Sequence, residues 1–88
     1  MDNKTKKELK ARAHALKPVV LLGDKGLTDA VLAEIENALA YHELIKIKIP
    51  SQDRELRDKV ALKIADTLKA ELVQGMGQIF TLYRQKEA

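Results

Sequence analysis

The stretch Val19-Val20-Leu21-Leu22-Gly23-Asp24-Lys25-Gly26-Leu27-Thr28 decides how this chain folds. It joins a short aliphatic run to a glycine-bounded turn, and the residues after Thr28 have the spacing of a helix. Glycine has no Cβ and tolerates a positive φ, so such a turn brings backbone N–H groups close to a ligand. The following helix directs its free N–H groups and positive dipole end toward the same point. The sequence therefore predicts an anion site at a strand–loop–helix junction, with Lys25 at the tip of the loop.

Three helices are predicted, in order, over about residues 5–17, 28–41 and 54–70. The first is expected to begin at the capping-box pattern Thr5-Lys6-Lys7-Glu8 and to end because Pro18 disfavours helical geometry in the residue before it. Thr28 is the expected N-cap of the second helix. Leu16 in the first helix and Leu56 in the third are expected to face inward.

Strands are predicted at residues 19–22, 44–49, 72–74 and 78–84. The first run has no polar alternation, which favours an interior strand or one that is covered on both faces. In the second, three isoleucines alternate with Lys46 and Lys48, so the isoleucines should face a core. The last two strands should form a hairpin with its turn at Gly75-Met76-Gly77.

The element order helix, strand, helix, strand, helix, strand, strand predicts an α/β fold (α+β, two-layer). We expect one domain over residues 1–88, with three helices packed on a small four-stranded mixed sheet.

The absence of cysteine excludes disulfides, thiolate zinc sites and cysteine nucleophiles. No run approaches the roughly 20 apolar residues that span a bilayer, and the N-terminus has no signal-peptide pattern. We expect a cytoplasmic monomer without membrane contact.

The formal net charge is +3, but the charges are unevenly distributed. Lys25 is the only cation between residues 21 and 45, where five acidic residues surround it, whereas the flanking regions are basic. Clustered lysines and arginines favour a polyanionic partner, because they displace counterions from phosphates. A solvated surface that keeps the protein soluble explains the same charges.

The loop has the pattern Gly-x-x-Gly. A dinucleotide fingerprint needs one more glycine, and a Walker loop needs Lys after the last glycine, whereas Lys25 precedes Gly26. A Gly-x-x-Gly loop also clamps single-stranded RNA in KH modules, although an ordinary tight turn has the same spacing.

Two other features each have two interpretations. His42-Glu43 is either an acid–base couple or a helix-end histidine beside an acid. Tyr83 either stacks on a base or packs inward. We expect no enzyme activity, no cofactor and no metal.

Several segments resemble the CRM domain (chloroplast RNA splicing and ribosome maturation), and especially bacterial stand-alone YhbY-type proteins. They are His14-Ala15-Leu16-Lys17-Pro18-Val19-Val20, Gly23-Asp24-Lys25-Gly26-Leu27-Thr28, His42-Glu43-Leu44-Ile45-Lys46 and Leu82-Tyr83-Arg84. The resemblance spans nearly the whole chain. It implies a fold similar to the C-terminal domain of bacterial translation initiation factor three, with an added N-terminal helix. It also implies binding to RNA of large ribosomal subunit precursors through the glycine loop and adjacent basic surface. Gly75-Met76-Gly77-Gln78 departs from the family, which often has a basic or hydroxyl residue after a glycine there.

We therefore predict an RNA-binding protein that acts in assembly of the large ribosomal subunit, with ribosomal RNA as its partner. The predicted contacts are Gly23, Asp24, Lys25, Gly26, Leu27, Thr28, Lys6, Lys10, Lys17, Lys46, Lys48 and Arg84. The alternative is a non-catalytic interaction module, whose sheet edge or basic helix docks a ribosomal or other acidic protein.

Overall fold

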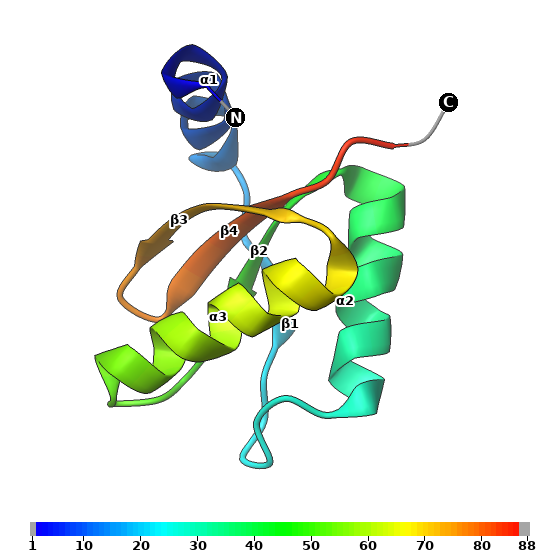
Figure 1. Ribbon diagram of the computed structural model, residues 1–88, viewed down its shortest axis with the longest axis vertical. Helices are drawn as coiled ribbons and strands as arrows, with labels where there is room; N and C mark the ends of the chain where they lie inside the picture. Colours follow the sequence, from blue (N-terminus) through cyan, green and yellow to red (C-terminus); the bar gives the residue numbers. More distant parts are fainter. Residues whose placement is uncertain (1, 87–88) are drawn as a thin grey trace.

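The computed structural model describes residues 2–86, and Figure 1 shows its three helices around a four-stranded sheet. In chain order the elements are α1 (Asn3–Ala13), β1 (Pro18–Leu21), α2 (Asp29–His42), β2 (Leu44–Lys48), α3 (Arg54–Leu68), β3 (Glu71–Met76) and β4 (Ile79–Tyr83). The strands lie in the order β1-β2-β4-β3; β1 pairs with β2 in parallel, and the other two pairings are antiparallel. The predicted element order and mixed sheet are confirmed.

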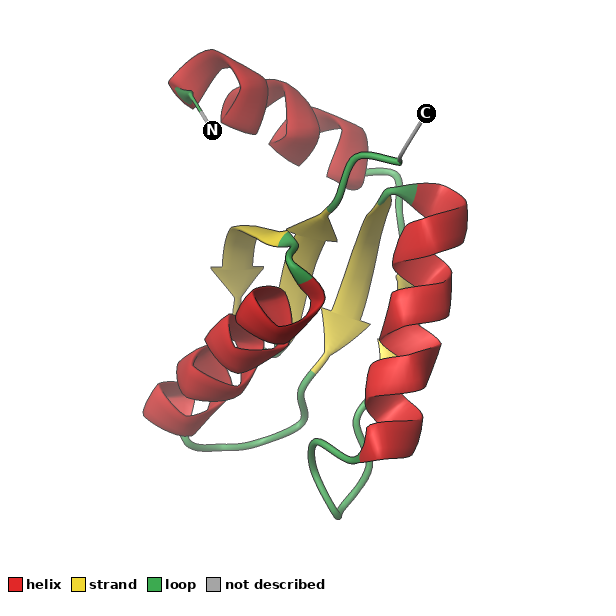
Figure 2. Ribbon diagram, turned by 45° about the vertical axis from the view of Figure 1, so that its right-hand side comes forward, coloured by secondary structure: helices red, strands yellow, loops and turns green. Residues whose placement is uncertain are grey.

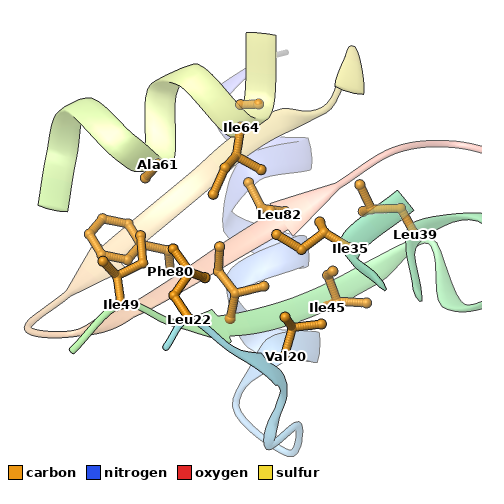
Figure 3. Close-up of a cluster of buried hydrophobic side chains, with 12 residues drawn as sticks. Val20, Leu22, Ile35, Leu39, Ile45, Ile49, Ala61, Ile64, Phe80 and Leu82 are labelled. Carbon is orange, nitrogen blue, oxygen red and sulfur yellow. The ribbon is translucent and has the colours of Figure 1, made fainter. Parts of the chain in front are cut away.

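Helices α2 and α3 cover one face of the sheet, and the main hydrophobic core lies between them and the strands (Figures 2 and 3). Ile45, Ile47 and Ile49 are buried in this core, while Lys46 and Lys48 are half-buried on the other face, as their alternation predicts. The other large side chains of the core are Val20, Leu22, Ile35, Leu39, Ile64, Phe80 and Leu82.

Helix α1 packs on the opposite face, over one end of the sheet. Its buried residues Leu9 and Ala13 form a second apolar cluster with Leu44 and Val73, and half-buried Tyr83 packs against it. Tyr83 therefore packs inward, one of the two roles predicted for it. Because Leu44 is the first residue of β2, α1 covers the end of the sheet where β2 begins and leaves the end near Lys48 open.

The ends of α1 differ from the prediction. Asp2 rather than Thr5 is the N-cap, because its carboxylate accepts a hydrogen bond of 2.7 Å from the Thr5 N–H. This bond also lowers the pKa of Asp2. The helix ends at Ala13, well before Pro18, and Leu16 lies outside it with 36% of its surface exposed. The predicted cap Thr28 is confirmed, because its hydroxyl accepts from the Val31 N–H at 3.2 Å. Asp53 caps α3 in the same way by accepting from the Leu56 N–H, also at 3.2 Å.

The first strand, β1, lies at the edge of the sheet, so the prediction of an interior or doubly covered strand is wrong. Val20 faces the core, but Val19 and Leu21 are 53% and 61% exposed. On their face of the sheet, α1 packs mainly on the other three strands. Leu56 was also predicted to face inward, yet half of its surface is exposed.

The hairpin turn lies closer to β4 than the predicted turn at Gly75-Met76-Gly77. Strand β3 continues to Met76 and β4 begins at Ile79, so Gly77 and Gln78 form the turn. Gly77 has a φ of +59°, which suits a tight hairpin turn. Gly75 lies within β3, paired with Phe80, and the Phe80 ring leaves no room for a side chain: a Cβ there would be 2.6 Å from Phe80 Cε1.

Candidate functional site

The glycine loop is a closed turn that faces open space. The Gly26 N–H donates a 2.9 Å hydrogen bond to the Gly23 carbonyl, and Gly26 has a φ of +71°. The backbone conformation therefore strongly favours glycine at this position, since other residues adopt this φ only at a cost. A Cβ built on Gly23 or Gly26 meets nothing within 4 Å. The turn is therefore accessible to a ligand that approaches its backbone.

The N-terminus of α2 directly follows this loop. Thr28 Oγ1 accepts from the Val31 N–H, which leaves the N–H groups of Asp29 and Ala30 among those that have no partner within the helix. Lys25 is exposed, but so are the carboxylates Asp24 and Asp29. Backbone N–H groups and the helix dipole, more than net side-chain charge, therefore make this junction attractive to an anion.

The loop lies at the end of the sheet where β1 and β2 both finish (Figure 1). Leu21 is paired with Lys48, and the Leu22 N–H donates to the Lys48 carbonyl at 3.0 Å. Lys48 is therefore the predicted strand contact nearest to the loop, and Lys46, opposite Pro18, lies farther along the same face. The structure brings the loop and Lys48 together.

The remaining predicted contacts lie away from the loop. Lys17 precedes β1 at its other end, and α1 carries Lys6 and Lys10 over the end of the sheet where β2 begins. Because β4 is antiparallel to β2, Arg84 also lies at that end. These four cations surround the far end of the sheet. Only a ligand as long as the sheet therefore reaches both these four cations and the loop with Lys48.

Arg84 is held in an ion pair inside the fold. Its guanidinium forms a bidentate pair with the Glu36 carboxylate, in which the Nη1–Oε1 distance is 3.0 Å, and Nη1 also donates to the Leu68 carbonyl at 2.9 Å. The hydrogen bonds from Arg84 lower the pKa of Glu36. Arg84 thus ties the end of β4 to both α2 and α3, and its side chain is only 25% exposed.

Two arginines near the start of α3 were missed by the sequence reasoning. Arg54 and Arg57 lie at the same end of the sheet as the loop, beside Gly75 and Gly77 of the hairpin, and line a groove of about 300 Å³. Arg57 Nη1 donates to the Ser51 carbonyl at 2.5 Å, and its buried Nε has no hydrogen-bond partner. The sequence did contain a signal for them. Both arginines lie near the start of a predicted helix, where a cation is unfavourable because it opposes the helix dipole. They place positive charge beside a hairpin turn that has no cation of its own.

Within residues 2–86, no three histidine or acidic side chains come together as metal ligands. None of the helices described here has the length and apolar character needed to cross a membrane.

Comparison with known proteins agrees with this arrangement. The CRS1/YhbY (CRM) domain family matches residues 1–84. A Haemophilus influenzae protein named "RNA-binding protein" is 51% identical over 87 residues, which cover 99% of this chain and 88% of that protein. A Pseudomonas aeruginosa protein whose name also describes RNA binding is 38% identical, with 97% and 82% coverage. The solution structure of a hypothetical Staphylococcus aureus protein superimposes with a TM-score of 0.87 at 25% identity, covering 100% of this chain and 92% of that one. The chain therefore belongs to the CRS1/YhbY (CRM) domain family.

Proposed function

We propose that this protein binds RNA of large ribosomal subunit precursors as a cytoplasmic monomer and acts in their assembly without catalysing a reaction. The observation that carries the proposal is the open glycine loop at the N-terminus of α2, with Lys48 and Arg54 at the same end of the sheet. The names of its relatives support RNA as the ligand. An RNA phosphate matches this end of the molecule in charge and hydrogen bonding.

In the proposed mechanism, one or two phosphates are held by N–H groups of the loop other than that of Gly26, which bonds to the Gly23 carbonyl, and by those of the first turn of α2. Gly26 supplies the left-handed conformation that the turn needs, and Gly23 leaves room for the phosphate to approach. Lys25 and Lys48 add charge beside the turn. Lys46, Lys17, Lys10 and Lys6 extend the contact along the sheet toward α1. Such contacts position the RNA backbone and carry little base specificity.

The structure makes Gly23 a sharper test position than Gly26. Gly26 has a positive φ, so a side chain there strains the fold, whereas Gly23 has neither a positive φ nor a neighbour that a Cβ would meet. Gly23→Leu should therefore leave the domain folded and block the approach of a phosphate. Ala33→Leu, at an exposed position of α2, is the matched control for added bulk.

Binding is measured by fluorescence anisotropy with a fragment of ribosomal RNA, and folding by circular dichroism. Gly23→Leu should weaken binding about tenfold, equivalent to about 1.4 kcal/mol, while Ala33→Leu binds as the wild type does. Unchanged affinity of a folded Gly23→Leu protein would remove the loop from the interface.

Salt dependence separates RNA binding from the alternative of a protein-docking module. Log affinity for single-stranded RNA should fall with log salt by a slope of about 0.7 for each phosphate neutralised. A protein interface with an apolar centre should respond less.

Sedimentation tests the assembly role. The protein should co-sediment with large-subunit precursors in a sucrose gradient and leave that fraction after RNase treatment. Sedimentation only at the top of the gradient would contradict that role.

A further inference from the structure

A second groove lies at the other end of β1 from the glycine loop. It has a volume of about 410 Å³ and lies among the end of α1, the segment that leads into β1, the end of α2 and the start of β2. Leu16, Val19 and Leu44 form part of its apolar lining, and Arg12, Lys17 and His42 also line it. Its volume is in the range of sites that hold small organic groups. Of the proposed phosphate contacts, only Lys17 lines this groove, and it lies away from the loop.

Two apolar side chains of the groove are well exposed. Val19 is 53% exposed and Leu16 is 36% exposed, although both are large aliphatic residues. Leu16 is held in place by a 3.0 Å hydrogen bond from its N–H to the Ala13 carbonyl, in the turn that follows α1. The chain therefore presents these two side chains in an ordered turn and an edge strand.

Planar groups accompany this apolar surface. His42 is exposed at the end of α2, and its ring meets the Tyr41 ring edge-on, with centroids 4.8 Å apart and planes at 76°. Arg12 contributes a planar guanidinium. Imidazole rings and guanidinium planes are both groups on which proteins stack unpaired RNA bases. No carboxylate is among the residues that line the groove, so a phosphate attached to such a base meets only cations there.

We infer that this groove is a nucleobase subsite, which accepts one unpaired base of the RNA strand whose phosphates the glycine loop holds. The inference rests on the proposed function and adds a base contact to it. From Lys17 to Gly23 the chain advances six residues, or about 20 Å at roughly 3.3 Å per residue. Between the two sites, Leu21 lies exposed on β1 beside Lys48 of β2. A single strand that follows this edge meets apolar surface for its bases and ammonium groups for its phosphates.

The test compares two ligands that differ only in their bases. One is a single-stranded oligoribonucleotide of about twelve residues, within the range that small single-strand-binding domains cover. The other has the same sugar-phosphate backbone with abasic sites throughout. His42→Ala removes one stacking group from an exposed position, and His14→Ala is the matched control, since His14 is exposed but does not line the groove. Lys25→Ala tests the loop in parallel.

The wild type should bind the normal oligonucleotide more tightly than the abasic one. His42→Ala should weaken binding of the normal oligonucleotide about fivefold or more, the effect of losing one base stack, and leave the abasic affinity unchanged. His14→Ala should change neither affinity, and Lys25→Ala should weaken both.

An equal loss on both oligonucleotides, or no loss, in a folded His42→Ala protein would overturn the subsite. The subsite would also be overturned if His42→Ala lost binding to a ribosomal protein but bound the oligonucleotide as the wild type does. The groove would then be a protein-docking site. If Lys25→Ala still weakens both ligands in these cases, the proposed function stands without the subsite. Failure of the wild type to bind either ligand would overturn both.

Discussion

Replacing Arg84 with alanine should destabilise the fold much more than it weakens RNA binding. The change removes the bidentate pair with Glu36 and the 2.9 Å hydrogen bond to the Leu68 carbonyl. A charge-assisted hydrogen bond at a largely buried group contributes about 1.5 kcal/mol. The ion pair adds only about 0.5 kcal/mol, because the Glu36 side chain is 45% exposed and solvent screens it. The expected loss in unfolding free energy is about 2 kcal/mol.

The measurement is urea unfolding followed by circular dichroism, with thermal unfolding alongside. A loss of about 2 kcal/mol lowers the Tm of a domain of this size by roughly 8–16 °C. Glu36→Gln is the matched variant. It should cost about 0.5 kcal/mol, because Arg84 keeps its bond to the Leu68 carbonyl.

The effect should also depend on pH, with a defined sign. Arg84 depresses the pKa of Glu36 in the folded state below its reference value of 4.5. The Glu36 contribution to stability is therefore fully present above pH 4.5 and is lost as the pH falls through the lower folded pKa. Below that pH, the wild type and Glu36→Gln should converge in stability. An Arg84→Ala protein as stable as the wild type, but with RNA binding abolished, would refute the structural role and make Arg84 an RNA contact.

Three further predictions concern single positions. Gly26→Ala should cost about 1–2 kcal/mol in a urea titration because its φ is +71°, whereas Gly23→Ala should change stability by less than about 0.5 kcal/mol; equal costs would contradict the loop conformation. Gly75→Ala should cost about 1–3 kcal/mol, since its Cβ would overlap the Phe80 ring, and an unchanged urea midpoint would argue against that packing. Asp24→Asn should raise RNA affinity about twofold in low-salt anisotropy, because it removes a repulsion of about 0.5 kcal/mol at ~8 Å in water; weaker binding would count against a phosphate at the loop.

Local patterns predicted those parts of the fold that depend on neighbours in the chain. The alternation of Ile45, Ile47 and Ile49 with two lysines identified both faces of β2, and Thr28 marked the start of α2. The edge position of β1 depends instead on strand order, which residues far apart in the sequence determine. The hairpin turn differs from the prediction because Gly75 and Met76 pair with Phe80 and Ile79 in the ladder, and turn propensity carries no information on that pairing.

The candidate site also has one part that the sequence predicts and another that depends on contacts between distant residues. The glycine loop and its capping threonine form one continuous segment, so the sequence was sufficient to predict the junction. The pairing of Arg84 with Glu36 joins residues 48 positions apart, and the sequence alone does not reveal it. Arg54 lies at the same end of the sheet as the loop because β1 and β2 run in the same direction, but it lies beside the hairpin, across the sheet from β1.

The parallel pairing of β1 and β2 also polarises the molecule. Both strands lead into a helix, so α2 and α3 begin at the same end, and each contributes about half a positive charge there. At the other end of α3, Arg84 binds the Leu68 carbonyl and offsets part of the matching negative charge. The N-termini of α2 and α3 offset part of the negative charge of Asp24, Asp29 and Asp53 at the loop end, whereas the lysines of α1 make the far end basic. The strand topology therefore affects the balance of charge between the two ends of the sheet as well as the shape of the site.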